Sequence, residues 1–303
     1  MSELEKPLLR RGDVEIRAKD IAYIRHFVKR YPGLSRSEVI YTLCEHLQWL
    51  TPGGRPKYDA SAKLLAQLEL AGEICLPSLK EQYRPHGPRR PRAPMEEIAP
   101  GEPVQCTLAE LGAVRVRLLS DVEQTHCNAS LASFHPLGYF KPFGYYARYR
   151  IEAGKLVLGY LLLSGAAKKI QSRDCWIGWT DQQRRHNLPW VVNNNRFLIF
   201  PWIKIPHLAS HILGQLARQL TDDWEVLWGF SPQLLESFVD PAHYRGTCYR
   251  AAGWELLGHT SGSGLARPGK DYHSSPKLLF VKPLQAQFRH LLCSDQLRER
   301  RDP

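Results

Sequence analysis

The sequence predicts an α+β protein: a three-helix domain of the winged-helix type, followed by a mixed-sheet domain. The first prediction rests on three short helical patterns and one strand pattern before residue 80. The second rests on strand and helix patterns that alternate over 193–260, as in a sheet with helices on its faces. We therefore expect a DNA-binding domain at 1–79, a linker at 80–105, the sheet domain at 106–290 and a charged tail at 291–303.

Composition narrows the class of protein. Of the 303 residues, 43% are hydrophobic, which is enough for a sizeable core. The seven cysteines occur singly and without a Cys-x-x-Cys pair, which argues against a disulfide framework or structural zinc and indicates a cytoplasmic protein. No apolar run reaches the roughly 20 residues of a membrane helix. The net charge of +11 favours a polyanionic partner, DNA first, although ordinary variation in surface charge is the alternative.

Helical signals dominate the first domain. Residues 1–17 are expected to form a loose basic leader, and 18–30 an amphipathic helix. Ser35 and Glu38 have the spacing of a capping box that starts a second helix. A third helix follows, and residues 73–77 are expected to form one strand.

The third helix of a winged helix-turn-helix lies in the major groove of DNA. Lysine and arginine on it would neutralise phosphates, and glutamine would read a base edge. The alternative is a packing or protein-contact domain whose charges are merely solvated. The residues expected to contact DNA are Arg55, Lys57, Tyr58, Lys63 and Gln67.

The linker contains six prolines with arginines between them. Proline excludes helix and interrupts strand pairing, so this arm is expected to be extended. Its DNA-contacting candidates are Arg89, Arg90 and Arg92, which would follow a phosphate backbone or enter a minor groove. A semi-rigid spacer is the alternative.

The second domain opens with an alternating strand at 114–118 and a helix over 121–131. Two strands flank Ala153-Gly154, which predicts a hairpin. Two short helices are expected within 165–187. The remaining elements are a strand entered through Asn193 to Asn195, a helix at 207–220, strands at 234–240 and 254–260, and a last strand at 278–281.

Two carboxylates are candidates for chemistry on DNA. Glu236 and Asp240 fall on one face of a strand by its period of two, so together they would hold Mg²⁺ or Mn²⁺ for phosphodiester cleavage. The structural alternatives are a buried hydrogen-bond partner for Glu236 and a helix cap for Asp240.

Four further positions complete the candidate site. Tyr249 would act as an acid or a nucleophile, or else pack as an ordinary aromatic residue. His135 would act as a base or an acid, or else shape its turn. Asn195, Arg196 and Thr260 are expected to contact phosphate or an extruded base, with backbone hydrogen bonding as the alternative.

The order of elements resembles the GNAT acyltransferase fold. Tyr249-Arg250-Ala251-Ala252-Gly253-Trp254 is similar to the segment in which active acetyltransferases carry a tyrosine that protonates the departing thiolate. The resemblance also implies a glycine-rich turn that holds the pyrophosphate of acyl-CoA. The corresponding turn, 206–210, has no glycine, so acyl-CoA is an unlikely cofactor on this reading.

The chain as a whole resembles the DruA family, from about Ile21 to Leu284. The similarity lies in Ile74–Pro77, His135–Gly138, Arg173-Asp174, Ile177–Trp179, Asn194–Ile199, Leu208–His211, Phe238–Asp240 and Gly246–Tyr249. Two positions depart from the pattern: Gly253 stands where the family often has asparagine, and Gly262-Ser263-Gly264 where it has Gly-Arg-Gly. The resemblance implies an anti-phage system or a mobile element.

Three hypotheses follow. The first is a nuclease or transposase-like protein that cuts or transfers DNA strands. The second is a non-catalytic DNA-recognition subunit that recruits a helicase or a transposase. The third is acyl or alkyl modification of a nucleobase or an amine. A homodimer is compatible with each of them, and no membrane is expected.

Overall fold

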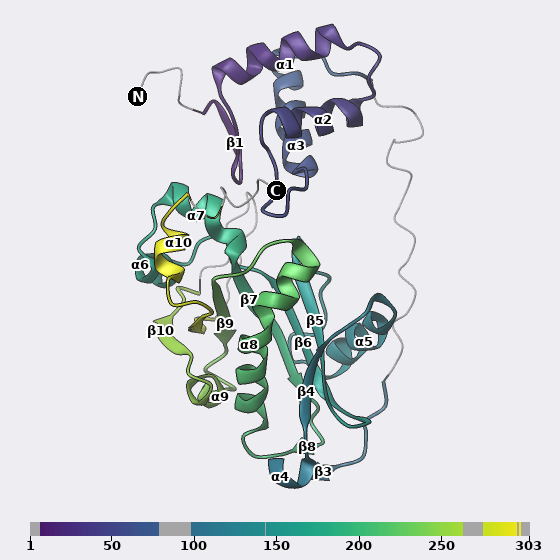
Figure 1. The fold of residues 1–303 in the computed structure, drawn as a ribbon, viewed down its shortest axis with the longest axis vertical. Coiled ribbons are helices and arrows are strands. Elements are labelled where there is room, and N and C mark those ends of the chain that lie inside the picture. The colour runs from purple at the N-terminus through teal and green to yellow at the C-terminus, as the bar shows by residue number, and fades with distance from the viewer. Residues whose placement is uncertain (1–6, 79–97, 143, 263–274, 296, 298–303) are drawn as a thin grey trace. The chain divides into compact units, whose positions relative to one another are not determined.

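The computed structural model describes residues 7–78, 98–142, 144–262, 275–295 and 297. These residues form two compact units, one within 1–93 and the other within 94–300, and each has its own hydrophobic core (Figure 1). Within the described part of the chain, no helix is long and apolar enough to cross a bilayer.

The first unit consists of a short hairpin and three helices. The elements are β1 (Leu9–Arg11), β2 (Val14–Ile16), α1 (Ala18–Arg30), α2 (Arg36–His46) and α3 (Tyr58–Leu70). The predicted capping box is confirmed at the start of α2. Glu38 N–H donates to the Ser35 hydroxyl at 3.3 Å, and Ser35 N–H donates back to the Glu38 carboxylate at 2.7 Å.

Two predictions for this unit are wrong. Residues 9–16 form the β1–β2 hairpin rather than a loose leader, because Val14 and Ile16 are buried in the core. Residues 73–77 form no strand. Ile74 and Leu76 alternate in burial with their neighbours because both insert into the core, not because they lie in a sheet. The hairpin therefore precedes the helices, and the described residues do not show the expected winged-helix order.

The second unit is built on one seven-stranded mixed sheet, in the order β10-β11-β9-β7-β6-β5-β4. Every neighbouring pair is antiparallel except β7 and β9, which are parallel. The mixed α+β sheet domain is thus confirmed, including the predicted hairpin between β5 and β6. The strands are β4 (Val114–Leu118), β5 (Tyr146–Ala153), β6 (Leu156–Gly165), β7 (Val191–Ile199), β9 (Leu234–Val239), β10 (Glu255–His259) and β11 (Leu278–Pro283).

Helices cover both faces of this sheet (Figure 1). The helices are α4 (Leu108–Leu111), α5 (Gln124–Phe134), α6 (Gln171–Ile177), α7 (Asp181–Asn187), α8 (Leu208–Trp228), α9 (Thr247–Ala251) and α10 (Phe288–Leu292). Neighbouring residues of β5 identify the two faces. Arg148 donates to Asn128 of α5 at 3.0 Å, whereas Tyr149, on the opposite face, lies beside Asp223 of α8.

Strand β7 contains a bulge at Asn195. Leu163 of β6 pairs with Asn194 and Leu162 pairs with Arg196, so Asn195 is an extra residue in β7. A bulge interrupts the alternation of side chains. It therefore directs Asn194 to the α9 face and Arg196 to the α5 face, as their hydrogen bonds confirm.

The domain limits predicted from composition need adjustment. Residues 104–105 were expected in the linker, but they form β3 (Val104–Gln105), which pairs in parallel with β8 (Ile203–Lys204). Leu297 was expected in a charged tail, but its side chain is buried in the core of the second unit. Apolar residues at a boundary can therefore join a core even where the surrounding sequence is polar.

Gly159 lies in β6 at a point of close backbone contact. A Cβ atom there would be 1.9 Å from the carbonyl oxygen of Leu198, which is backbone and cannot move aside. We expect Gly159→Ala to lower the free energy of unfolding by about 2 kcal/mol, as overpacking does. Gly165→Ala, in the same strand, is the control, because nothing lies within 4 Å of its Cβ position. Equal urea midpoints for the two variants would contradict this account.

Candidate functional site

Strands β7 and β9 part shortly after they meet. Their parallel pairing covers three residue pairs, from Val191–Leu234 to Asn193–Glu236. Asn194 and Ser237 are the next residues on the two strands. The opening between the strands lies on the face covered by α8 and α9, beside the bulge of β7.

Tyr249 of α9 fills this opening with its hydroxyl group. Asn194 Nδ2 donates to the Tyr249 hydroxyl at 3.1 Å, and the Ser237 hydroxyl lies 2.8 Å from it. The ring of Tyr249 stacks on Phe280, with centroids 5.2 Å apart. Gly246, the residue before α9, makes this packing fit, because a Cβ atom there would be 2.4 Å from the Phe280 ring.

Burial determines the protonation state of Tyr249. Desolvation raises its pKa well above the ordinary value, against the opposing effect of the hydrogen bonds from Ser237 and Asn194. The hydroxyl is therefore neutral at pH 7 and keeps its proton. Asn194 is also buried, and its Oδ1 atom has no hydrogen-bond partner among the described residues. The opening thus contains a neutral acid group and an acceptor atom free for a further donor.

The turn before α8 adopts the conformation of a glycine although it contains none. His207 has φ +62°, in the left-handed region that side chains rarely enter. The helix that follows is 21 residues long. Its first backbone N–H groups lack partners within the helix, as at any helix start, and they attract anions.

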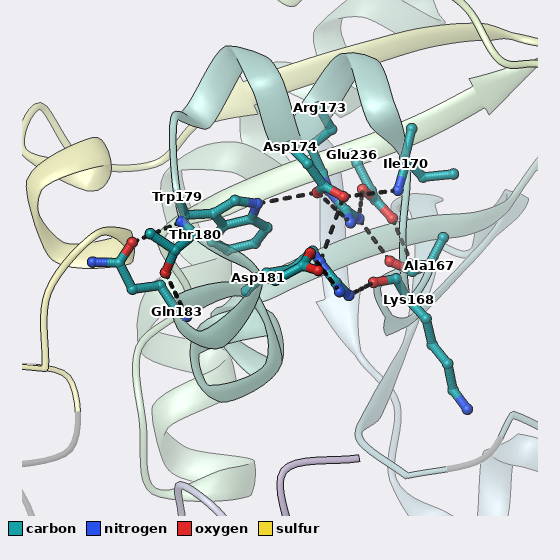
Figure 2. Close-up of polar contacts among 11 residues, drawn as sticks. Ala167, Lys168, Ile170, Arg173, Asp174, Trp179, Thr180, Asp181, Gln183 and Glu236 are labelled. Atoms are coloured by element: carbon teal, nitrogen blue, oxygen red, sulfur yellow. Dashed lines mark hydrogen bonds and ion pairs between the residues drawn. The ribbon is translucent and has the colours of Figure 1, made fainter. Parts of the chain in front are cut away.

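A buried ion network lies on the opposite face of β9 (Figure 2). Arg173 of α6 is fully buried and donates to Glu236 Oε2 at 2.7 Å, and Glu236 is also fully buried. Arg173 donates to Asp174 Oδ1 through two nitrogens, at 3.0 and 2.8 Å. Trp179 Nε1 donates to the same oxygen at 3.2 Å. The charges of these buried groups therefore compensate one another.

The same network fixes the segment between β6 and α6. Ala167 N–H donates to Glu236 at 2.9 Å, and Arg173 donates to the Ala167 carbonyl at 2.8 Å. Ile170 N–H donates to Asp174 at 3.1 Å, and Arg184 of α7 donates to the Lys168 carbonyl at 2.6 Å (Figure 2). Residues 167–170 are thus held through their backbone by buried charged side chains.

The hydrogen bonds of Glu236 bear on its two interpretations. Its two oxygens accept from Arg173 and from Ala167 N–H, which matches the alternative of a buried hydrogen-bond partner. The described residues contain no group of three or more histidine, cysteine, aspartate or glutamate side chains that could hold a metal ion. Binding of Mg²⁺ or Mn²⁺ by Glu236 and Asp240 therefore stays a prediction. No preformed cluster of three such ligands among the described residues supports it.

Asp240 lies just beyond β9 and is partly exposed. Its carboxylate accepts from Lys277 Nζ and from Ala242 N–H, the latter at 3.1 Å. The bond from Lys277, and then the one from Ala242, lowers the pKa of Asp240 below its usual value. Asp240 is therefore ionised, and it caps a turn rather than a helix, because α9 begins only at Thr247.

His135 lies beside Arg196 at the end of α5. Burial, and then the charge of Arg196, lowers the pKa of His135 to about 4, so the imidazole is neutral at pH 7. Its Nδ1 accepts from Leu137 N–H at 3.1 Å, as in the alternative of a turn-shaping histidine. Arg196 donates to the Gly138 carbonyl at 2.8 Å, and Asn195 donates to the Ser164 hydroxyl at 2.9 Å.

Three of the five DNA-binding candidates of the first unit point to solvent, namely Arg55, Lys63 and Gln67. Lys57 forms an ion pair with Asp13 and is mostly buried. Tyr58 packs on Tyr41 with ring centroids 4.9 Å apart.

The remaining DNA-binding candidates are the three linker arginines and Thr260. Arg89, Arg90 and Arg92 lie outside the described residues. Thr260 N–H donates to the Lys277 carbonyl at 2.8 Å, and its hydroxyl accepts from Lys277 N–H at 3.0 Å. These bonds match the alternative for Thr260, backbone hydrogen bonding, and its contact with phosphate stays a prediction.

Sequence reasoning missed three residues of these sites: Arg173 as the centre of the network, Ser237 beside Tyr249, and Lys277 beside Asp240. Only the adjacent pair Arg173-Asp174 gave a signal, because a charged pair can enter a core together. Ser237 and Lys277 carry no local signal, since their partners are brought near by the sheet.

The fold and these sites define an α+β protein whose sheet parts at one parallel strand pair and carries a buried ion network behind it. The family model described as Druantia protein DruA matches residues 77–267, more than half of the chain. The chain belongs to the DruA family. No curated protein sequence matches it.

Solved structures similar to the chain are acyltransferases. Aminoglycoside acetyltransferase AAC(6')-Ib, solved with coenzyme A and kanamycin, is 17% identical with a TM-score of 0.37, over 62% of this chain and 99% of that one. A probable GNAT-family acetyltransferase from Chromobacterium violaceum is 12% identical with a TM-score of 0.35, over 66% and 96%. FeeM, an N-acyl amino acid synthase from uncultured soil microbes, is 11% identical with a TM-score of 0.33, over 57% and 90%. Scores this low do not bear on the chemistry of this chain.

The buried pair of Arg173 and Glu236 leads to a prediction about stability. We expect Glu236→Ala to lower the free energy of unfolding by about 3–5 kcal/mol, because it leaves Arg173 as an uncompensated buried charge. Asp240→Ala, which removes a partly exposed carboxylate, should stay near the wild type. Urea denaturation, with and without EDTA, measures both. A wild-type stability that depends on EDTA, or a stable Glu236→Ala variant, would favour the metal interpretation instead.

Proposed function

We propose that the chain is a component of an anti-phage defence system, and that its second unit transfers a group, in the first instance an acyl group, to an amine or a nucleobase. The observation that supports this proposal is the opening between β7 and β9, into which Tyr249 of α9 extends a neutral hydroxyl. The family membership supports the defence context.

The chain's own residues supply the chemistry of proton transfer. The Tyr249 hydroxyl is held by Asn194 and Ser237, so its position does not depend on a ligand. A neutral phenol donates a hydrogen bond or a proton to a leaving group, which is the role of a general acid. Asn194 Oδ1, buried and without a partner among the described residues, accepts from an N–H group of the bound molecule.

Acyl-CoA fits the turn before α8 better than the sequence suggests. The missing glycine argued against it, but His207 itself adopts the left-handed conformation that a glycine would supply. The N–H groups of Ala209 and Ser210, in the first turn of α8, would hold a pyrophosphate. A hollow of about 640 Å³ lies beside this turn and is lined by Lys204 and Pro206. Coenzyme A would supply an activated thioester there.

Calorimetric titration with acetyl-CoA tests this proposal. We expect saturable binding that Ala209→Glu weakens about tenfold or more, because a carboxylate at the start of α8 repels phosphate. Arg218→Glu, further along α8 on an exposed position, is the control. Tyr249→Phe should retain binding and lower thiol release, with spermidine or a DNA oligonucleotide as acceptor, about 100-fold. Absence of binding by the wild type would exclude acyl-CoA as the donor.

DNA recognition by the first unit is the second candidate function. Its support is the net charge of +11 and the exposure of Lys63 and Gln67, which lie one turn apart on the same side of α3. In this role the protein would deliver a helicase or a transposase to DNA. Strand cleavage at Asp240 is a further form of this proposal, and it requires that Asp240 and Glu236 bind a Mg²⁺ or Mn²⁺ ion.

Duplex binding measured by fluorescence anisotropy tests the second candidate. We expect Lys63→Ala to weaken binding and to lower the slope of log K against log salt by about 0.9, the value for one phosphate contact. Lys29→Ala, an equally exposed lysine at the end of α1, is the matched control. An equal effect of both substitutions would indicate diffuse attraction by surface charge and no recognition helix.

A further inference from the structure

A second cavity lies on the α6 face of the sheet, where β9 and β10 end. Its volume is about 710 Å³, within the range of small-molecule sites. The side chains that matter here are Lys169, Ser172, Phe238, His259, Thr260 and Lys277. We call this cavity the basic groove. The proposed acyl-transfer site does not include any of these residues.

Successive side chains of β9 point to opposite faces of the sheet. This alternation places the basic groove on one face and Tyr249 on the other. Ser237 points to Tyr249 on one face of the sheet. Glu236 points to Arg173 on the other face, and Phe238, on the same side as Glu236, lines the groove. The two sites therefore lie on opposite faces of one strand, and a ligand in the groove leaves the Tyr249 site free.

Two lysines give the groove its positive charge. Lys277 Nζ donates to Asp240 and, at 2.7 Å, to the Ser275 hydroxyl. An ammonium group has three donors, so one remains for a ligand. Lys169 is exposed, and its charge, after the hydrogen bond from Arg184, contributes to lowering the pKa of Asp181. The positive charge at the mouth of the groove is thus partly, but not fully, compensated.

One wall of the groove is fixed in advance by the buried ion network. Residues 167–170 lead directly to Ser172, and their backbone is tied to Glu236, Asp174, Arg173 and Arg184 (Figure 2). The backbone around Lys169 is therefore already fixed, so less conformational entropy is lost when a ligand binds. Ser172 lines the groove, and its buried hydroxyl has no hydrogen-bond partner among the described residues.

Phe238 gives the groove an aromatic surface. The ring is half-buried, packs against the core and lines the cavity. An exposed aromatic face next to lysines and hydroxyls is the arrangement that binds nucleotides, because bases stack on the ring while phosphates meet the cations. A purely anionic ligand would not require the ring, and a purely apolar ligand would not require the lysines.

We propose that the basic groove binds a nucleotide, with its base against Phe238 and its phosphate between Lys169 and Lys277. The nucleotide is either part of a single DNA strand or free in solution. The buried network of Arg173, Asp174 and Glu236 serves as the support that positions Lys169 and Ser172. This site is independent of the proposed acyl transfer.

The test uses the full chain and two probes, a fluorescein-labelled oligothymidylate followed by anisotropy and free dTMP followed by calorimetry. We expect Lys169→Ala and Phe238→Leu each to weaken binding about tenfold. Lys168→Ala is the matched control, since this neighbouring exposed lysine does not line the groove, and it should change affinity less than about twofold. Lys169→Ala should also lower the salt slope by about 0.7, the value for one phosphate of a single strand.

Each outcome has a defined meaning. Binding of the oligonucleotide but not of dTMP identifies a strand as the source of the nucleotide, and equal dependence of both probes on Phe238 identifies a free nucleotide. Equal effects of Lys168→Ala and Lys169→Ala, or no effect of Phe238→Leu, would overturn the proposal. So would inorganic phosphate that binds as tightly as dTMP. Lys63→Ala, in the first unit, separates any contribution of α3 from that of the groove.

Discussion

The fully buried ion pair between Arg173 and Glu236 is the interaction on which the second unit depends. Both side chains have left water, which costs several kcal/mol for each ion unless every polar atom is satisfied. Here the hydrogen bonds that Arg173 and Glu236 make to Asp174 and Ala167, besides the one that joins them, meet that requirement. The pair joins β9 to α6 and helps to fix residues 167–170, which connect β6 to α6, so one buried interaction determines the shape of a large part of the α6 face.

Successive side chains of β9 point to opposite faces of the sheet, and the two faces present different chemical environments. On the α9 face, the neutral Tyr249 hydroxyl and the Asn194 amide are buried and hydrogen-bonded to each other. On the α6 face, Phe238 and Lys277 line an open groove that suits a charged aromatic ligand. The bulge at Asn195 contributes to this division, because it turns Asn194 and Arg196 to opposite sides of the sheet.

Local sequence signals predicted many of the elements. The helix at 18–30, the capping box of Ser35 and the hairpin around Gly154 depend on residues close together in sequence, and the structure confirms them. The strand expected at 73–77 failed because alternating burial also arises when a loop inserts two side chains into a core. The hairpin at 9–16 was missed because its stability comes from contacts of Val14 and Ile16 with distant helices.

The sequence by itself determined the α+β class, most helices and strands of the second unit, the resemblance to the DruA family and the prominence of Tyr249, Glu236 and Asp240. These depend on periodicity, turn residues and motifs, which are local. The tertiary structure decided their roles. Glu236 meets Arg173 across 63 positions of sequence, Tyr249 meets Asn194 across 55, and Lys277 meets Asp240 across 37. Whether a carboxylate is a ligand, an acid or the partner of a buried arginine depends on such distant neighbours, because its charge is stabilised only by what surrounds it in space.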